Sequence, residues 1–268
     1  MAKNDKTVVG VSDLHCGQWA GLTPQGGKWR GAGLEVGKRQ PLRKECWEFY
    51  KAKVKDIGKC HAAFVLADAV DGSGKASGGT ELLVADMQEQ CAMATEALLE
   101  IKTDRFVMVR GTPYHVGKDT DWEDLIARNL CKAGREATIH DHVWPEVNGC
   151  VFDLKHKVGG SSIPHGRGTS ISKEKLWNSL WALHGGQQPD ANVVLRGHVH
   201  YHICVSQAGW HAMTMPALQA AGTKYGGRQC SGTVDFGLME FNINEKGAFR
   251  YEPHLLVPRN QTVKALKI

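Results

Sequence analysis

The sequence predicts an α/β fold, a four-layer α/β/β/α sandwich of two mixed sheets flanked by helices. Two observations on the order of the elements predict this class, and a third concerns the ends of the strands. The first part of the chain alternates short apolar, β-branched runs with longer stretches of helical periodicity, as βαβ units do. The part that follows residue 200 is mainly strand-like. Aspartate and histidine residues directly follow several of the apolar runs, which places polar groups where buried strands end.

The elements are predicted in chain order from the spacing of apolar residues. We expect helices at 43–59, 83–101, 122–130 and 176–183, and the last of them is marked by Leu176, Leu180 and Leu183 with Trp177 and Trp181 beside them. The polar, glycine-containing stretches 68–80, 110–120 and 159–172 are expected to be loops. We expect strands at 7–11, 63–67, 105–109, 151–155, 194–196, 203–206, 211–215, 234–243 and 249–256, with a turn at Asn148 and Gly149.

Domain organisation follows from what the sequence lacks. We see no internal repeat and no low-complexity linker, so residues 1–268 are expected to form a single domain. A glycine-rich insertion at about 18–40 carries Trp19 and Trp29, which are expected to pack in the interior or to stack on bases.

Composition limits the possible classes of protein. The hydrophobic fraction of 42% and the charged fraction of 23% are ordinary for a globular protein, and the net charge of +5 suits an anionic substrate. The eight cysteines are scattered without a C-x-x-C pair, and nothing at the start resembles a signal peptide, so a cytoplasmic location is expected. No apolar run approaches the roughly 20 residues of a membrane span, so no membrane association is expected. No protein partner can be inferred.

Aspartate, histidine and threonine side chains collect at the ends of five predicted strands. One apolar run ends in Gly197, His198 and an alternate His200, and we expect Gly197 to let the backbone turn sharply there. Imidazole and carboxylate groups bind Zn, Mn and Fe. Because carboxyl ends of parallel strands meet at one edge, a metal site is predicted there. Its candidate residues are Asp13, His15, Asp68, Thr112, His115, His156, His198 and His200.

Five motifs in this order resemble those of the calcineurin-like metallophosphoesterase superfamily, most of all its divergent members in phages and prophages. They span about 70% of the chain. The motifs are Asp13-Leu14-His15, Ala67-Asp68-Ala69-Val70-Asp71-Gly72, Arg110-Gly111-Thr112-Pro113-Tyr114-His115, His156 and Gly197-His198-Val199-His200.

The resemblance implies a metallophosphoesterase fold and a centre of two divalent metal ions. Asp13, His15 and His200 would hold the first metal. Asp68 would bridge both, and His156 and His198 would hold the second. Such a centre activates a hydroxide that attacks phosphorus in line. The ligand types accept Mn, Zn, Fe or Ni, with Mn favoured.

The sequence departs from the family pattern at two motifs. Thr112 stands where the family has a metal-binding asparagine, so a water or a weaker hydroxyl ligand would complete the second site. His115 is displaced by two residues and is assigned the role of general acid toward the leaving oxygen. Ala67 replaces a glycine and is expected to cost little, and Asp71 is expected to support a ligand rather than to bind metal.

The fourth ligand has an alternative, since His165 lies in a loop shortly after His156. We favour His156 because a strand end fixes a ligand better than a loop does. His140 and His142 are expected to be surface or hydrogen-bonded groups.

Substrate binding is assigned to residues of the loops at the same strand ends, where arginine can chelate phosphate oxygens. The candidates are Arg110, Thr112, His165, Arg167, Lys224, Tyr225 and Arg228. We expect a metal-dependent phosphoesterase that hydrolyses phosphodiester bonds, with a nuclease acting on DNA or RNA as its leading form. The alternatives are a phosphomonoesterase or protein phosphatase, a small or cyclic nucleotide phosphodiesterase, and a metal-binding module without catalytic activity.

Overall fold

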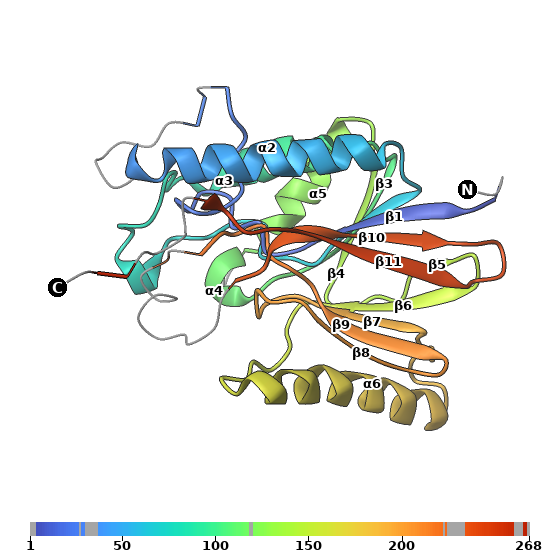
Figure 1. The fold of residues 1–268 in the computed structure, drawn as a ribbon. Helices are drawn as coiled ribbons and strands as arrows, with labels where there is room; N and C mark the ends of the chain where they lie inside the picture. The colour runs from blue at the N-terminus through green and yellow to red at the C-terminus, as the bar shows by residue number, and fades with distance from the viewer. Residues whose placement is uncertain are drawn as a thin grey trace.

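The structure is a computed structural model, which describes residues 4–26, 28–29, 37–117, 120–221, 223, 234–259 and 265–266. Two sheets lie one above the other, and helices cover their outer faces (Figure 1). The predicted α/β class with two mixed sheets flanked by helices is therefore confirmed.

The first sheet has six strands in the order β11-β10-β1-β2-β3-β4. Its four parallel members are β1 (Lys6–Val11), β2 (Ala62–Val65), β3 (Arg105–Val109) and β4 (Glu136–His140). Its antiparallel members are β10 (Phe236–Ile243) and β11 (Phe249–Leu256). The central strands are buried along most of their length, as strands covered on both faces must be.

The second sheet has five strands in the order β5-β6-β7-β9-β8. They are β5 (Glu146–Val147), β6 (Cys150–Lys155), β7 (Val193–Arg196), β8 (Ile203–Gln207) and β9 (Trp210–Thr214). Strands β6, β7 and β9 are parallel, and β5 and β8 are antiparallel to their neighbours. The predicted turn between β5 and β6 is confirmed, because Asn148 and Gly149 both have the positive φ values of a tight hairpin turn.

Helices form the two outer layers. The first sheet is covered by α2 (Gln40–Ile57), α3 (Met87–Leu99) and α5 (Glu123–Lys132), and the second by α6 (Arg167–Leu183). One short helix, α4 (Pro113–Val116), follows β3 at the end of the first sheet. Two single-turn 3₁₀ helices, η1 (Lys75–Ser77) and η2 (Pro164–Gly166), lie in connections.

Three apolar clusters separate the four layers. The largest joins the first sheet to α2, α3 and α5 and includes Tyr50, Leu98 and Leu130. A second lies between the sheets, where Phe64 and Phe152 meet edge to face at 5.2 Å. The third, beneath α6, has only five fully buried members: Val158, Ile171, Ala191, Val194 and Ala212. The cluster under α6 is thus the smallest of the three among the described residues.

The structure corrects two loop predictions and answers the question about the two tryptophans. The stretch 110–120 contains α4, which begins at Pro113, a residue that suits the first turn of a helix. The stretch 159–172 was predicted to be a loop, but α6 begins at Arg167, where small polar residues hide its first turns from apolar periodicity. Ser172 satisfies its hydroxyl within the helix by donating to the Gly168 carbonyl at 2.7 Å. Trp19 is buried, and Trp29 packs on the same core and donates to Glu96.

Within the described residues, no helix combines the length and the apolar character needed to cross a bilayer.

Candidate metal centre

The ends of β1, β2 and β3 in the first sheet and of β6 and β7 in the second point to one place. The chain segments after β1 and β2 run side by side, because Asp13 and His15 donate their backbone N–H groups to the carbonyls of Ala67 and Asp68 at 3.0 and 2.9 Å. The polar residues of two distant segments are therefore held together by main-chain hydrogen bonds.

Unusual backbone conformations are concentrated at these ends. Seven described residues other than glycine have positive φ, and five of them are predicted metal ligands: Asp13, His15, Asp68, His198 and His200. Left-handed conformations disfavour residues with a Cβ and persist only where the surrounding structure enforces them. The fold therefore holds these side chains in a strained arrangement, as functional sites often do.

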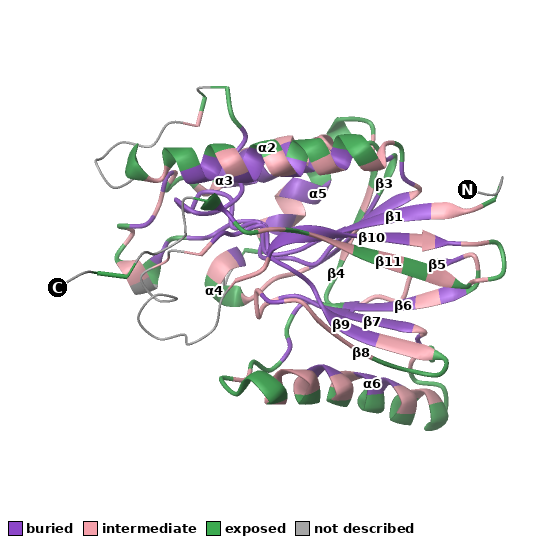
Figure 2. Cartoon of the chain, viewed as in Figure 1, coloured by how far each residue is buried: buried purple, intermediate pink, exposed green. Residues whose placement is uncertain are grey.

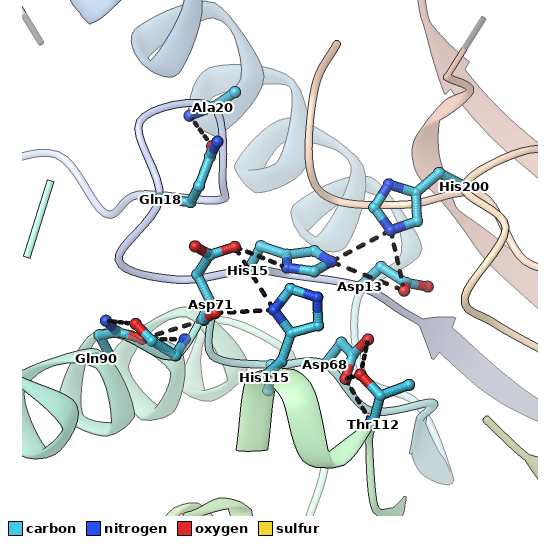
Figure 3. A network of polar contacts seen from close by, with 12 residues as sticks. Asp13, His15, Gln18, Ala20, Asp68, Asp71, Gln90, Thr112, His115 and His200 are labelled. Carbon is cyan, nitrogen blue, oxygen red and sulfur yellow. Dashed lines mark hydrogen bonds and ion pairs between the residues drawn. The ribbon is translucent and has the colours of Figure 1, made fainter. Parts of the chain in front are cut away.

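The first cluster contains Asp13, His15 and His200 (Figure 3). His200 Nε2 lies 3.2 Å from Asp13 Oδ1 and 3.2 Å from His15 Nε2. The second oxygen of Asp13 accepts hydrogen bonds from the hydroxyl of Ser12 and from the backbone N–H of His198, at 3.1 Å in the latter case. Two imidazole nitrogens and one carboxylate oxygen thus converge on a common point.

The second cluster contains Asp68, His156 and His198. His156 Nε2 lies 2.9 Å from Asp68 Oδ2 and 4.0 Å from Asp13 Oδ1, so the same imidazole faces both carboxylates. The opposite ring nitrogen is 2.7 Å from the Leu66 carbonyl, which fixes the orientation of the ring. The two clusters are therefore adjacent and meet at His156.

The alternative fourth ligand, His165, does not join either cluster. It is exposed on η2, whereas His156 is buried at the end of β6. His142 is bonded instead to Asp153, with 2.7 Å between Nε2 and Oδ1, which fits its expected role as a hydrogen-bonded group.

The charges of the two buried carboxylates are stabilised by surrounding imidazoles. Burial alone would raise the pKa of Asp68, but the hydrogen bond with His156 and nearby histidines lower it to about 2. Burial opposes ionisation of Asp13 as well, yet His200, His156 and His15 together move its pKa below the usual value. Both carboxylates are therefore ionised across the ordinary pH range, as cation binding requires.

The imidazoles divide into two groups. Burial acts to lower the pKa of His156, but Asp68 and Asp13 raise it to about 10. Burial and the neighbouring His156 lower the pKa of His198. Burial, followed by His15, lowers the pKa of His115. His115 and His198 thus favour the neutral form, which can act as a ligand or as a proton acceptor.

Asp71 supports the first cluster as expected. Its Oδ1 lies 3.1 Å from His15 Nδ1, which leaves Nε2 of that ring facing Asp13 and His200. Its backbone carbonyl accepts a hydrogen bond from His115 Nδ1 at 2.8 Å, and the His15 and His115 rings meet edge to face at 4.5 Å (Figure 3). His115 therefore lies beside the cluster, and its general-acid role stays a prediction.

Thr112 and Ala67 frame Asp68. The backbone N–H of Thr112 donates to Asp68 Oδ1 at 2.8 Å, and its hydroxyl lies 3.3 Å from the same oxygen. Ala67 has a φ of 64°, so its cost is conformational, about 1–2 kcal/mol for a residue with a Cβ. The expectation that the alanine costs little was therefore wrong.

Gly197 also has a different role from the one expected. It does not adopt the positive φ of a sharp turn, and that conformation belongs to His198 instead. A Cβ at Gly197 would lie 2.3 Å from Ser12 Oγ, 2.9 Å from Asp13 Oδ2 and 3.0 Å from His156 Nδ1. The glycine is needed because ligands of both clusters pack against its backbone.

Sequence reasoning missed two buried polar residues that hold the site. Glu123 accepts hydrogen bonds from the backbone N–H groups of Ala69 and Gly111 at 2.8 and 2.7 Å, and burial raises its pKa to about 7. Gln90 accepts from Asp71 N–H and donates to a carbonyl of the same loop. The available signal was their helical spacing, because Glu123 precedes the core-facing Ile126 and Leu130 of the same helix.

A cleft of about 560 Å³ opens beside the second cluster. Its wall includes Thr112, His115, His156, His198 and three basic residues, Arg110, Lys155 and Lys157. Arg110 is already engaged, with carboxylates of Asp121, Asp124 and Asp141 within 3.5, 2.8 and 3.1 Å.

The other proposed substrate-binding residues are placed elsewhere or lie outside the description. Arg167 lies on the first turn of α6 and stacks over the Tyr201 ring at 4.2 Å. His165 is exposed on η2. Lys224, Tyr225 and Arg228 fall outside the described residues.

No protein family profile matches the sequence, and no curated protein matches it. Similar solved structures include Vps29 of Entamoeba histolytica complexed with Zn²⁺, at 12% identity and TM-score 0.42 over 92% of this chain and 97% of that one. A novel archaeal phosphodiesterase matches at 12% identity and TM-score 0.45, over 92% and 99% of the two chains. A predicted phosphoesterase of Streptococcus pneumoniae TIGR4 matches at 13% identity and TM-score 0.39, over 94% and 99%.

Proposed function

We propose that the protein is a metal-dependent phosphoesterase that hydrolyses phosphodiester bonds, with nucleic acid as its favoured substrate. The observation that carries the proposal is the convergence of six predicted ligands, from strand ends of two different sheets, into two adjacent clusters. Without a metal ion, burying two aspartates and four imidazoles together costs free energy. Each cluster contains a charged group and nitrogen or oxygen acceptors that lack a hydrogen-bond donor.

The donor atoms fit divalent metal ions. Within each cluster the candidate ligand atoms lie within 4.8 Å of one another, and binding to one ion at about 2.1 Å in a tetrahedral site would draw them to roughly 3.4 Å apart. Asp13, His15 and His200 would hold one ion, Asp68, His156 and His198 would hold a second, and Asp68 would bridge. Mixed oxygen and imidazole donors suit Mn, Zn, Fe or Ni, and Mn is favoured. Bound metal ions would stabilise charge on phosphoryl oxygens and lower the pKa of a water nucleophile.

The protein's own groups would orient this chemistry. Asp71 holds His15 by a hydrogen bond, and Glu123 binds the backbone N–H groups of Ala69 and Gly111, which lie in the two loops beside Asp68. The Nδ1–H of His115 is used by the Asp71 carbonyl, so only Nε2 could exchange a proton with the leaving oxygen, and it would act as a general acid only in the imidazolium form.

The cleft favours a substrate with more than one phosphate. Lys155 and Lys157 are exposed on its wall, and no ion pair of either is found in the described part of the chain. Tyr114, on the same wall, is 47% exposed and presents an aromatic surface to the cleft. Two available cations and an aromatic ring beside a phosphoesterase centre are the elements that bind a nucleic-acid backbone and its bases.

A hydrolysis panel with added Mn tests the proposal. It should contain an aryl monoester, an aryl diester, cyclic nucleotides, single-stranded and duplex DNA, and RNA. We expect hydrolysis of the diesters and of at least one polynucleotide. Faster hydrolysis of the monoester would favour a phosphomonoesterase, and cleavage of cyclic nucleotides alone would favour a small-nucleotide enzyme. Asp68→Asn should abolish all activity, and activity that survives in it would contradict the assignment.

A second arm tests the nucleic-acid part alone. Replacing Lys155 and Lys157 together by glutamine should raise KM for a polynucleotide about tenfold while leaving hydrolysis of the aryl diester unchanged. Lys173→Gln is the matched control, since this lysine is exposed on α6, away from the cleft. An unchanged KM in the cleft variant would contradict nucleic acid as the substrate without touching the phosphoesterase proposal.

The alternative of a metal-binding module without catalysis rests on Thr112, whose hydroxyl stands where the resembled family has an amide. Stoichiometric metal binding combined with no turnover on the whole panel would favour that alternative.

A further inference from the structure

Helix α6 buries two polar side chains and exposes five large apolar ones. The residues of α6 that are buried are Ile171, Lys175 and Asn178. Lys175 and Asn178 are satisfied there by hydrogen bonds to the segment that returns to β7, with Lys175 Nζ 2.6 Å from Asp190 Oδ1 and 2.8 Å from the Ala191 carbonyl. The inner face is therefore a polar anchor with little apolar area.

The outer face carries a group of apolar residues, here called the α6 stripe, and Figure 2 shows the side of α6 turned away from the second sheet mainly as exposed. It consists of Leu176, Trp177, Leu180, Trp181 and Leu183, with exposed fractions of 60, 54, 45, 38 and 85%. These are five of the ten large hydrophobic residues that are exposed in the described part of the chain. The apolar spacing that predicted this helix is thus real, but it does not face the core.

We propose that the α6 stripe is the interface of a symmetric dimer, in which α6 of one copy packs antiparallel against α6 of a second copy of this chain. The stripe exposes about 600 Å² of apolar area, at the upper end of what monomers expose in one patch. Two stripes covering each other would bury about 1,200 Å², which is the lower limit for a specific interface, and flanking atoms add to it.

The order of residues in the stripe suits two-fold pairing. Leu180 stands in the middle, with Trp177 three residues before it and Leu183 three residues after it. An antiparallel pair centred on Leu180 therefore sets Trp177 of each copy against Leu183 of the other, so the same surface is complementary to itself. The Trp177 and Trp181 rings already stack, with centroids 6.2 Å apart and planes at 19°, so little side-chain freedom is lost on contact.

The charges favour a second copy over a lipid surface. Among the lysines and arginines of α6, only Lys173 is exposed, whereas helices that lie on membranes present several cations. Lys173 stands at one end of the stripe, and antiparallel pairing separates the lysines of the two copies. No carboxylate side chain interrupts the stripe.

Sedimentation velocity of the full chain tests the proposal. We expect a dimer that dissociates on dilution, and Leu180→Glu should be monomeric at every concentration while keeping its circular dichroism spectrum and its Mn-dependent hydrolysis. Val257→Glu is the matched control, since Val257 is 82% exposed outside the stripe, and it should remain a dimer. A monomeric wild-type protein, or a dimer that survives Leu180→Glu, would overturn the proposal. Wild-type monomers that sediment with anionic lipid vesicles would replace it with a membrane surface.

A cross-link provides a second readout that does not depend on a destabilising charge. In a Cys131→Ser background, which removes an exposed thiol, Leu180→Cys should form an intermolecular disulfide on mild oxidation. Thr169→Cys, exposed on the same helix but eleven positions away, should not. Equal cross-linking at both positions would contradict antiparallel pairing about Leu180.

Discussion

Replacing Gly197 by alanine should weaken metal binding although residue 197 donates no ligand atom. The added Cβ would lie 2.3 Å from Ser12 Oγ, 2.9 Å from Asp13 Oδ2 and 3.0 Å from His156 Nδ1. Ser12, Asp13 and His156 are at most 2% exposed, so none of these groups can move aside into solvent. The substitution therefore displaces a ligand of each cluster at once.

The size of the effect follows from these contacts. Contacts below 3.0 Å force neighbouring atoms to shift, and overpacking of this kind in a dense interior costs about 1–3 kcal/mol of unfolding free energy. Changes that disturb the orientation of metal ligands typically lower metal affinity about 10- to 100-fold. We expect both losses in Gly197→Ala.

Calorimetric titration with Mn and urea unfolding of the metal-free protein measure the two losses separately. Gly160→Ala is the matched control, because a Cβ there meets no atom closer than Val199 Cγ1 at 3.8 Å. It should bind Mn and unfold like the wild type. The reasoning is refuted if Gly197→Ala binds Mn with wild-type affinity, since the ligand atoms would then not depend on the backbone packed at residue 197.

Three further substitutions address groups that support the site. Asp71→Asn should lower Mn affinity about tenfold, because an amide holds His15 less firmly than a carboxylate does. A calorimetric titration that shows wild-type Mn affinity would contradict the role of Asp71 in holding His15. Burial raises the pKa of Glu123 from 4.5 to about 7. The protonated carboxyl group therefore contributes its full stabilisation of the metal-free protein below pH 4.5, and this stabilisation, up to about 3 kcal/mol, is lost as the pH rises through 7. Glu123→Gln should remove this part of the slope when urea unfolding is followed across that pH range, and parallel slopes would count against it. Thr112→Asn should strengthen binding of a second Mn ion, since an amide oxygen next to Asp68 is a better ligand than a hydroxyl, and unchanged stoichiometry and affinity would argue that Thr112 lies outside the coordination sphere.

The convergence of the candidate ligands was predictable because the rule behind it is geometric. Carboxyl ends of parallel strands meet at one edge, so Asp13 and Asp68, which follow neighbouring strands, had to lie close together. The same rule favoured His156 over His165, and the structure places only His156 among the other ligands. The rule does not predict which other residues hold the candidate ligands in position. Glu123 lies on α5, and its hydrogen bonds reach the backbone of Ala69 and Gly111, which are distant from it in sequence.

The orientation of α6 shows why periodicity alone was insufficient. Leucines and tryptophans at helical spacing predict an apolar face, but they do not say whether that face meets the core or another molecule. The deciding groups are Lys175 and Asn178, whose hydrogen bonds to the segment before β7 turn the polar side inward. Those hydrogen-bond partners lie more than ten residues away in sequence, so the spacing of residues within the helix does not predict them. The same limit applies to Gly197, whose neighbours come from other strands.

Anomalous diffraction at the Mn absorption edge, from crystals of Mn-loaded protein, tests the central claim most directly. The account predicts two peaks in adjacent positions, one among Asp13, His15 and His200 and the other among Asp68, His156 and His198. Crystals that show no anomalous peak among these six side chains, or a peak only at another place on the molecule, would contradict it.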